Sequence, residues 1–136
     1  MRSFRYSHVV TLDETNLVGN VYFAHYLRWQ GHCREHFLGE HAPGVLAELT
    51  AGELALVTVS CSMDYYAEAF ALERLDVDMS LRATARNRVE MDFAFRRAED
   101  LIARGAQVVA CMRRDGGGMR PTPVPPELAR ALREFS

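Results

Sequence analysis

A polar turn leads into an aromatic helix over residues 13–26, which read Asp13-Glu14-Thr15-Asn16-Leu17-Val18-Gly19-Asn20-Val21-Tyr22-Phe23-Ala24-His25-Tyr26. Asparagine and glycine supply the turn chemistry, and from about Asn20 the apolar residues recur with the period of a helix. We expect the helix to end at Gly39, a plausible C-cap, because Pro43-Gly44 follows soon after it. A second short helical segment is expected over residues 45–49.

The predicted helix is apolar around most of its circumference. One stripe consists of Phe23, Leu27, Gln30, Arg34 and Leu38. The neighbouring stripe consists of Tyr22, Tyr26, Trp29, Cys33 and Phe37. The remaining stripe is polar and consists of His25, Arg28, His32 and Glu35. A helix of this kind is expected to be wrapped by a broad surface such as a sheet.

Strand patterns lie on both sides of the helix in the sequence. Alternating residues predict a half-buried strand over 4–12 and four further strands over 54–63, 75–86, 89–95 and 106–112. Clean alternation is typical of antiparallel sheets with one packed face. The packed residues are expected to be Leu75, Val77, Met79, Leu81, Ala83 and Ala85, then Val89, Met91, Phe93 and Phe95, then Ala106, Val108, Ala110 and Met112.

The C-terminal part is predicted to leave the sheet at Asp115-Gly116-Gly117-Gly118 and to form a short helix that begins at Pro126. The apolar side of that helix carries Leu128, Ala131, Leu132 and Phe135. The expected fold class is therefore α+β, with a five-stranded antiparallel sheet wrapped around a long central helix. No internal repeat interrupts this pattern, so residues 1–136 are expected to form one domain.

Composition narrows the classes of protein further. The 136 residues are 49% hydrophobic and 25% charged, which is ordinary for a globular chain. The net charge of −2 argues against a nucleic-acid binder. The N-terminal residues lack an apolar signal core, and no apolar run is long enough to span a bilayer, so we expect a cytoplasmic protein. The three cysteines are widely spaced and predict neither a zinc site nor a disulfide framework.

The segment Thr15-Asn16-Leu17-Val18-Gly19-Asn20-Val21-Tyr22, followed by Tyr26-Leu27-Arg28 and Arg34, resembles the hotdog-fold acyl thioesterases of the 4-hydroxybenzoyl-CoA thioesterase type. The resemblance covers about residues 4–114. Common members of that family have Asp at the position of Asn16 and often Glu near Gly31-His32. Both acids are absent here, and this pattern is similar to the thioesterases of enediyne polyketide biosynthesis.

The resemblance implies a site and a substrate. Asn16, Arg34 and Tyr26 would be catalytic, and the substrate-binding residues would be Gly19, Asn20, Tyr22, Phe23 and Leu27. The substrate would be a β-ketoacyl polyene linked through phosphopantetheine to the acyl carrier domain of an iterative polyketide synthase. The acid released could decarboxylate to a methyl-ketone polyene. No cofactor or metal is implied. The chain is expected to form at least a homodimer, and a homotetramer is expected because the family often forms tetramers.

The residue chemistry fits electrostatic catalysis. A helix N-terminus offers unpaired N–H groups that suit an oxyanion. Asn16 can orient water but cannot act as a base, Arg34 is permanently charged, and Tyr26 is a candidate partner for Arg34 or the substrate. Arg34 lies roughly 16 Å along the helix from Phe23 at 1.5 Å per residue. We therefore expect the loop with Asn16 to fold back over the helix, or a neighbouring subunit to complete the site.

Each of these residues also has a simpler interpretation that requires no catalytic role. Asn16 fits a helix-entry or turn residue, Arg34 fits an ion pair with Glu35 or another surface acid, and Tyr26 fits a core aromatic. Cys33 lacks a His–Asp partner pattern for a nucleophile, and the histidines lack a carboxylate pattern that would complete a metal site. The alternative functions are a housekeeping acyl-CoA or acyl-carrier thioesterase, a dehydratase or isomerase on the same fold, and a non-catalytic protein that binds acyl carriers.

Overall fold

The computed structural model describes residues 2–136, and Met1 lies outside the described residues. Its elements are, in chain order, β1 (Phe4–Val9), a 3-10 turn η1 (Leu12–Glu14), α1 (Ala24–His41), α2 (Pro43–Thr50), β2 (Leu54–Tyr65), β3 (Arg74–Ala85), β4 (Arg88–Arg97), β5 (Asp100–Asp115), β6 (Gly118–Pro121) and α3 (Pro126–Arg133). No helix in residues 2–136 is both long enough and apolar enough to cross a membrane.

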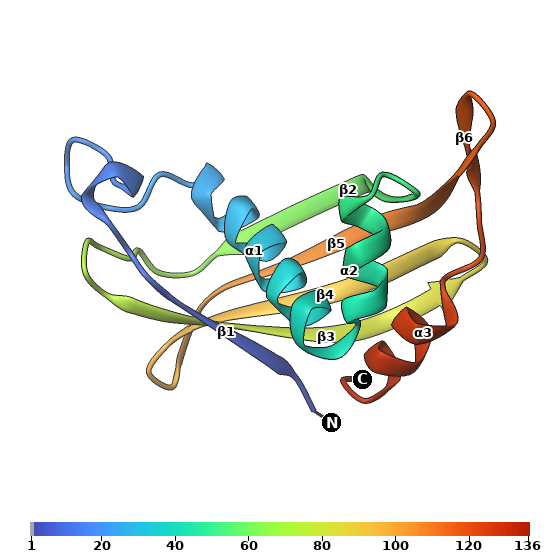
Figure 1. Cartoon of the computed structure of the whole chain (residues 1–136). Helices are drawn as coiled ribbons and strands as arrows, with labels where there is room; N and C mark the ends of the chain where they lie inside the picture. Colours follow the sequence, from blue (N-terminus) through green and yellow to red (C-terminus); the bar gives the residue numbers. More distant parts are fainter. Residues whose placement is uncertain (1) are drawn as a thin grey trace.

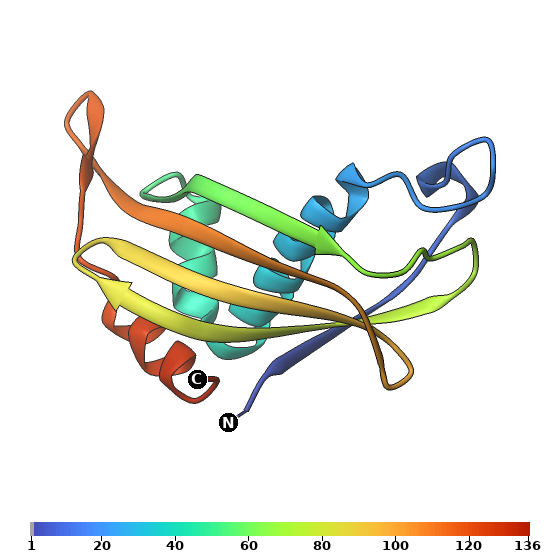
Figure 2. The ribbon, with the colours of Figure 1, turned by 180° about the vertical axis from the view of Figure 1, so that it is seen from behind.

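One antiparallel sheet with the order β1-β3-β4-β5-β2 curls around α1, and all three helices lie on the same side of it (Figure 1). Seen from behind, the other face of the sheet has no helix over it, with β2 at one edge and β1 at the opposite edge (Figure 2). The expected α+β fold with a sheet wrapped around a central helix is confirmed.

A sixth strand was not expected. The sheet does not end at Asp115 to Gly118. The chain reverses direction there, and β6 pairs with the end of β5. Gly116 has φ of +62°, a left-handed conformation that glycine adopts without strain and that tight hairpin turns require.

The core lies between α1 and the concave face of the sheet. Trp29, Phe37 and Leu38 from α1 are fully buried together with Phe93 and Phe95 from β4. The inward faces predicted for β3 and β4 are confirmed from Leu75 to Met79 and from Val89 to Phe95.

The face predicted for β5 is wrong. Its buried residues are Gln107, Val109 and Cys111, whereas Ala106, Val108, Ala110 and Met112 are half-buried on the outward face. This strand carries small apolar residues on both faces, so alternation alone could not separate them. The inward position of a polar side chain at Gln107 is stabilised by hydrogen bonds inside the core.

The boundaries of α1 also differ from the prediction. The helix begins at Ala24 rather than at Asn20, because residues 15–21 are held in bridges to each other and to Phe70. It continues past Gly39 to His41, since the N–H of Ala42 still donates to the Leu38 carbonyl at 2.9 Å. Strand β1 ends at Val9, where the chain turns into η1.

Gly105 of β5 lies beside the hydrogen bond that Gln30 of α1 donates to the Ser62 carbonyl of β2. A methyl group at this position would stand 2.5 Å from the carbonyl oxygen of Ser62 and closer still to Gln30 Nε2 and Met63 Sδ. Because the Ser62 oxygen belongs to the backbone of β2, the sheet itself would have to move to accept it. The absence of a side chain at Gly105 therefore lets Gln30 reach across β5 to β2.

We predict that Gly105→Ala lowers the free energy of unfolding by about 1–3 kcal/mol, the usual cost of overpacking a filled core. Gly117→Ala is the matched control, because nothing lies within 4 Å of the added methyl group in the exposed β5–β6 turn. Urea unfolding followed by circular dichroism measures both variants. Equal stability of the two variants would contradict the close packing at Gly105.

Candidate active site

A small hairpin over residues 14–22 precedes α1 and carries Asn16 near its tip. The Tyr22 N–H donates to the Glu14 carbonyl at 3.0 Å, and the Asn16 N–H donates to the Asn20 carbonyl at 2.7 Å. The Gly19 N–H closes the tip by donating to the Asn16 carbonyl at 2.9 Å. Gly19 has φ of +94°, which other residues adopt only with strain, so the glycine determines the shape of this loop.

The tip of the hairpin is exposed and carries two apolar side chains between two asparagines. Asn16 Nδ2 donates to Asn20 Oδ1 at 3.3 Å, and Asn20 Nδ2 donates to Glu68 Oε1 at 3.0 Å. Leu17 and Val18 are almost wholly exposed at the tip. The amide of Asn16 is therefore surrounded by surface that an apolar ligand or a second copy of the chain could cover.

The N-terminus of α1 follows directly. Phe23 is the N-cap residue and no side chain caps the helix. Within residues 2–136 the N–H groups of Phe23 and Ala24 have no acceptor, while the Phe23 carbonyl accepts a hydrogen bond from the Tyr65 hydroxyl at 2.9 Å. Free N–H groups at the positive end of a helix suit an oxygen that gains negative charge.

A buried carboxylate holds the hairpin to the helix and to the sheet. Glu14 Oε2 accepts a hydrogen bond from Trp29 Nε1 at 3.0 Å, and Oε1 accepts one from the Thr11 N–H at 2.9 Å. The Nε2 atom of His8 in β1 lies 2.9 Å from Oε1. Burial alone would raise the pKa of Glu14, but the hydrogen bonds from Thr11, His8 and Trp29 outweigh it and lower the pKa to about 2.

Arg34 lies on the third turn of α1 and is largely buried. Its Nη1 donates to Gln107 Oε1 at 2.7 Å, and its buried Nε has no hydrogen-bond partner in residues 2–136. No carboxylate of the described chain lies within ion-pair distance, so the alternative of a pair with Glu35 is wrong. Burial lowers the pKa of Arg34, although a guanidinium stays charged under ordinary conditions.

Arg34 forms part of the wall of a narrow apolar slot. The slot lies between α1, the sheet and α3, and its other walls are Phe37, Leu38, Leu56, Val89, Met91, Val109, Leu128 and Leu132. Its volume is only about 10 Å³, so a chain of carbon atoms can enter only if these side chains move.

The predicted catalytic residues do not meet within one chain. Asn16 bonds to Asn20, Arg34 bonds to Gln107, and the hairpin is tied to residues 68–70. The expectation that the loop folds back over α1 is therefore wrong, and its alternative, completion of the site by a neighbouring subunit, stays a prediction. Tyr26 is buried against aromatic rings, among them Tyr65 and Phe95, which raises its pKa to about 12. No hydrogen bond joins Tyr26 to Arg34 in the described residues.

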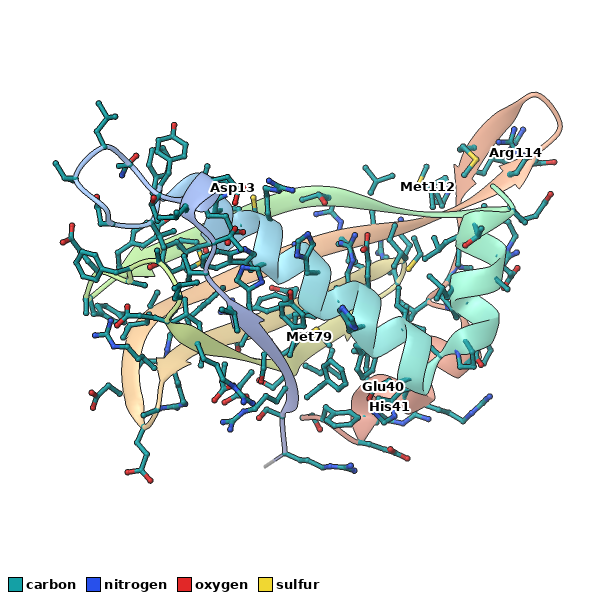
Figure 3. All side chains as sticks on the ribbon, turned by 60° about the vertical axis from the view of Figure 1, so that its left-hand side comes forward. Asp13, Glu40, His41, Met79, Met112 and Arg114 are labelled. Atoms are coloured by element: carbon teal, nitrogen blue, oxygen red, sulfur yellow. The ribbon has the colours of Figure 1, made fainter. Side chains whose placement is uncertain are left out.

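The predicted substrate-binding residues lie around the start of α1. Gly19 and Asn20 belong to the hairpin, Tyr22 and Phe23 are exposed beside the free N–H groups, and Leu27 is half-buried one turn into the helix. Figure 3 shows Asp13 next to the hairpin, whereas Glu40 and His41 lie at the other end of α1, away from this region.

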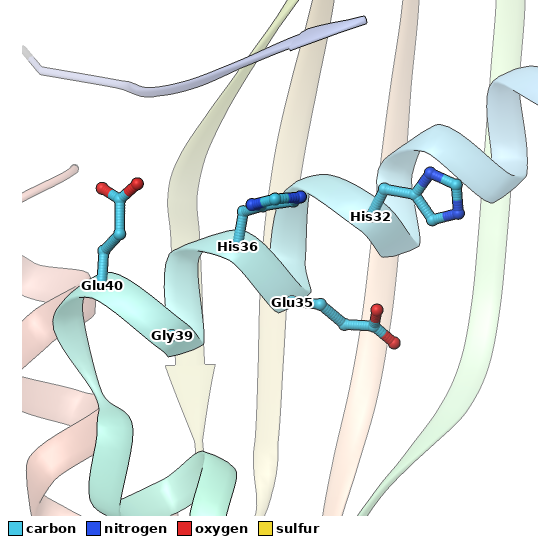
Figure 4. Close-up of a pocket in the computed structure, with 5 residues that line it drawn as sticks. All are labelled: His32, Glu35, His36, Gly39 and Glu40. Atoms are coloured by element: carbon cyan, nitrogen blue, oxygen red, sulfur yellow. The ribbon is translucent and has the colours of Figure 1, made fainter.

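The outward face of α1 carries a separate, shallow depression of about 430 Å³, lined by His32, Glu35, His36, Gly39 and Glu40 (Figure 4). The described residues contain no group of three or more His, Cys, Asp or Glu side chains that could hold a metal ion. Cys33 is buried beneath this face, and burial raises the pKa of its thiol, which makes it a poor nucleophile.

Sequence reasoning missed three polar residues that shape this region. Glu14 is detectable as the last residue of a Thr-x-x-Glu pattern with Thr11, the signature of a capping box. Gln30 and Gln107 are the only glutamines in the chain, and each interrupts an apolar pattern. A polar residue at an inward position with such a pattern is a sign of an internal hydrogen-bond partner.

Comparison with known proteins adds independent information. Residues 10–132 match the model of the thioesterase-like superfamily. The 1,4-dihydroxy-2-naphthoyl-CoA hydrolase of Synechocystis sp. is 28% identical over 127 residues, 92% of each chain. The crystal structure of a 1,4-dihydroxy-2-naphthoyl-CoA thioesterase from Synechocystis has a TM-score of 0.86 and 25% identity, over 98% of this chain and 97% of that one. Crystal structures of the dynemicin thioesterase, described with polyene binding, reach a TM-score of 0.93 and 56% identity over 98% and 96%.

We predict that the Glu14 carboxylate stabilises the fold in a pH-dependent way. Its pKa is lowered in the folded protein, so the stabilisation is present above the unfolded value of 4.5 and is lost as the pH falls toward about 2. At neutral pH, Glu14→Gln should lower the free energy of unfolding by about 1–3 kcal/mol, the range for a hydrogen bond to a charged group. Thermal unfolding of both proteins across this pH range measures the difference.

The difference between wild type and Glu14→Gln should shrink steadily as the solution becomes more acidic. Glu99→Gln, which removes an exposed carboxylate from the β4–β5 turn, is the control and should unfold like the wild type. A difference that stays constant down to the lowest pH would show that the charge of Glu14 is not what stabilises the hairpin.

Proposed function

From the premise that the chain belongs to the thioesterase-like superfamily and is a thioester hydrolase, we propose that its substrate is a β-ketoacyl polyene on the acyl carrier domain of an iterative polyketide synthase of the enediyne type. The observation that carries the proposal is Arg34, a largely buried cation without a carboxylate partner in the wall of an apolar slot. Once the side chains that line the slot move apart, such a site suits a polar thioester at the end of a long apolar chain. The 56% identity to the dynemicin thioesterase supports the same substrate class.

The proposed chemistry stabilises charge rather than moving protons through a base. Water adds to the thioester carbonyl, and the carbonyl oxygen gains negative charge beside the free N–H of Phe23. The carbon–sulfur bond then breaks, and the proton lost by the water goes to the departing sulfur, which leaves as the phosphopantetheine thiol. Asn16 holds the water or the carbonyl, and Arg34 polarises the acyl group. A β-keto group already activates the thioester, so positioning and charge can carry the reaction.

The fate of the product follows from its chemistry. Hydrolysis releases a β-keto acid, which can lose CO₂ when the pair of electrons from the carboxyl–carbon bond moves toward the ketone. A proton then adds to the α-carbon and gives a methyl ketone. Arg34 beside the ketone oxygen would stabilise the enolate that forms during this step.

We infer that the complete site takes Asn16 from one copy of the chain and Arg34 from another, because the two side chains have separate partners within one chain. Strand β2 is an edge strand, and Val57 and Val59 are half-exposed on it. An exposed apolar edge strand is a natural pairing surface. We propose a homodimer joined through β2, assembled further into a homotetramer, with residues 1–136 acting as one domain in the cytoplasm beside the synthase.

An aromatic acyl-CoA is the second candidate substrate. The relatives from Synechocystis act on 1,4-dihydroxy-2-naphthoyl-CoA, and they are 25–28% identical to this chain. The higher identity to the dynemicin thioesterase favours the polyene. Both substrates belong in the same assay, because each would give free acid by the same chemistry.

We predict that the protein releases free acid or methyl ketone from a 3-oxoacyl thioester on a carrier domain, and that it does so faster than from 1,4-dihydroxy-2-naphthoyl-CoA. Mass spectrometry follows both products. Asn16→Ala and Arg34→Ala should each lower kcat about tenfold or more, the effect of removing one transition-state donor. Arg28→Ala, on the exposed face of the same helix, is the control. Near-wild-type rates for both site variants would contradict the assignment.

We predict that the two inactive variants restore each other when they are mixed. Asn16→Ala and Arg34→Ala are unfolded together in equal amounts and refolded, so that about half of the dimers are mixed. Each mixed dimer has one site with both residues intact, so activity should return to about a quarter of the wild-type value. Each variant refolded alone is the control, and a mixture no more active than the controls would place both residues in the same chain's site.

A further inference from the structure

We propose that Gln107 and Gln30 form a buried relay of amides that positions Arg34 as an unneutralised cation; this rests on the proposed function of Arg34. The relay starts at the backbone of β2, crosses the core between α1 and β5, and ends on the guanidinium. Gln30 is completely buried and Gln107 is 5% exposed, so both amides are withdrawn from water. They are positioning residues and have no contact with substrate in this proposal.

The contacts form a continuous series. Gln30 Nε2 donates to the Ser62 carbonyl at 3.0 Å and lies 3.0 Å from Met63 Sδ. Gln107 Nε2 lies 3.5 Å from Gln30 Oε1, and Gln107 Oε1 accepts the hydrogen bond from Arg34 Nη1 at 2.7 Å. Each amide thus has a donor on one side and an acceptor on the other.

The direction of the relay is determined at β2. A backbone carbonyl can only accept, so Gln30 must turn its NH₂ group toward Ser62 and its oxygen toward Gln107. Gln107 must then turn its NH₂ group toward Gln30 and its oxygen toward Arg34. If either amide were reversed, two donors or two acceptors would face each other in a dry environment, which is costly.

Gly105 supports this arrangement independently. A side chain at this position would collide with Gln30 Nε2 and with the Ser62 carbonyl, which are the two atoms of the first hydrogen bond. The strand is therefore open at the one residue where the amide passes. The hydrogen bond between Gln30 and Ser62 can form only because residue 105 has no side chain.

The choice of an amide over a carboxylate has a chemical consequence. A glutamate at position 107 would have the same length and could accept the same hydrogen bond, but its charge would pair with Arg34. A paired guanidinium polarises a carbonyl less, because the nearby negative charge opposes the stabilisation of a second one. The neutral amide of Gln107 orients the Arg34 guanidinium without cancelling its positive charge, so this charge can act on the substrate.

The decisive variant is Gln107→Glu, assayed with the 3-oxoacyl carrier thioester for kcat and KM and by thermal unfolding for stability. The proposal expects kcat to fall about tenfold or more, as on loss of one electrostatic contact in the transition state, with little change in KM. It expects the variant to stay folded at the assay temperature, because the new ion pair with Arg34 offsets the loss of the hydrogen bond that Gln107 Nε2 donates to Gln30 Oε1. A structural role alone would keep kcat, since the hydrogen bond to Arg34 is preserved.

Gln30→Met is the second variant and removes the relay one step away from Arg34 without adding charge. It should lower kcat about fivefold, the equivalent of one neutral hydrogen bond, because the Gln107 amide is then free to turn. Asn87→Asp is the matched control: it makes the same change from amide to acid in the β3–β4 turn, where Asn87 Nδ2 donates to the Cys111 carbonyl. Its kcat should equal that of the wild type.

Wild-type kcat in Gln107→Glu would overturn the relay while leaving the proposed function intact. Arg34→Gln is measured beside it to separate the two ideas. Full activity of Arg34→Gln would overturn the assignment of Arg34 and the relay together. Loss of activity in Arg34→Gln with wild-type kcat in both relay variants would overturn the relay alone.

Discussion

The carboxylate of Glu14 joins three parts of the chain that are otherwise only neighbours. It accepts hydrogen bonds from Thr11, which caps η1, from His8 of β1 and from the indole of Trp29 in the second turn of α1. Trp29 is fully buried, so the contact ties the hairpin with Asn16 to the middle of the core and not to its surface. The position of Asn16 relative to the start of α1 depends strongly on this buried charge, since the rest of the hairpin is held by backbone bridges to residues 69 and 70 and by the hydrogen bond from Asn20 to Glu68.

The two buried charged side chains of the region, Glu14 and Arg34, differ in how completely they are hydrogen-bonded. Both carboxylate oxygens of Glu14 accept hydrogen bonds, and these hydrogen bonds lower its pKa. Arg34 has one amide oxygen and a buried Nε without a partner, and its pKa is lowered by burial. A charge left incompletely paired reduces stability, and proteins retain such charges where they serve a function. In the proposed mechanism, Glu14 holds the site together and Arg34 acts on the substrate.

The fold could be predicted from the sequence because it rests on repeated, local patterns. The period of three to four in α1 and the alternation in β3 and β4 each involve many residues, so single exceptions do not change the result. Prediction failed where one face is not more apolar than the other, as in β5, and where a few backbone bridges replace the first turn of a helix, as at residues 20–23. The candidate site was predictable only as separate residues. Sequence spacing gives the distance along α1 but not the partner of Arg34, because Gln107 is 73 positions away in the chain.

The β5–β6 hairpin lies at the far corner of the sheet from the hairpin with Asn16, as the positions of Arg114 and Asp13 in Figure 3 show. Added methyl groups at its three glycines, Gly116, Gly117 and Gly118, would meet no atom within 4 Å. Exposed tips of this kind tolerate inserted sequence, since few contacts of the fold pass through them. A fluorescent label can therefore be built into this turn, and the enzyme can be followed from a point remote from the candidate active site.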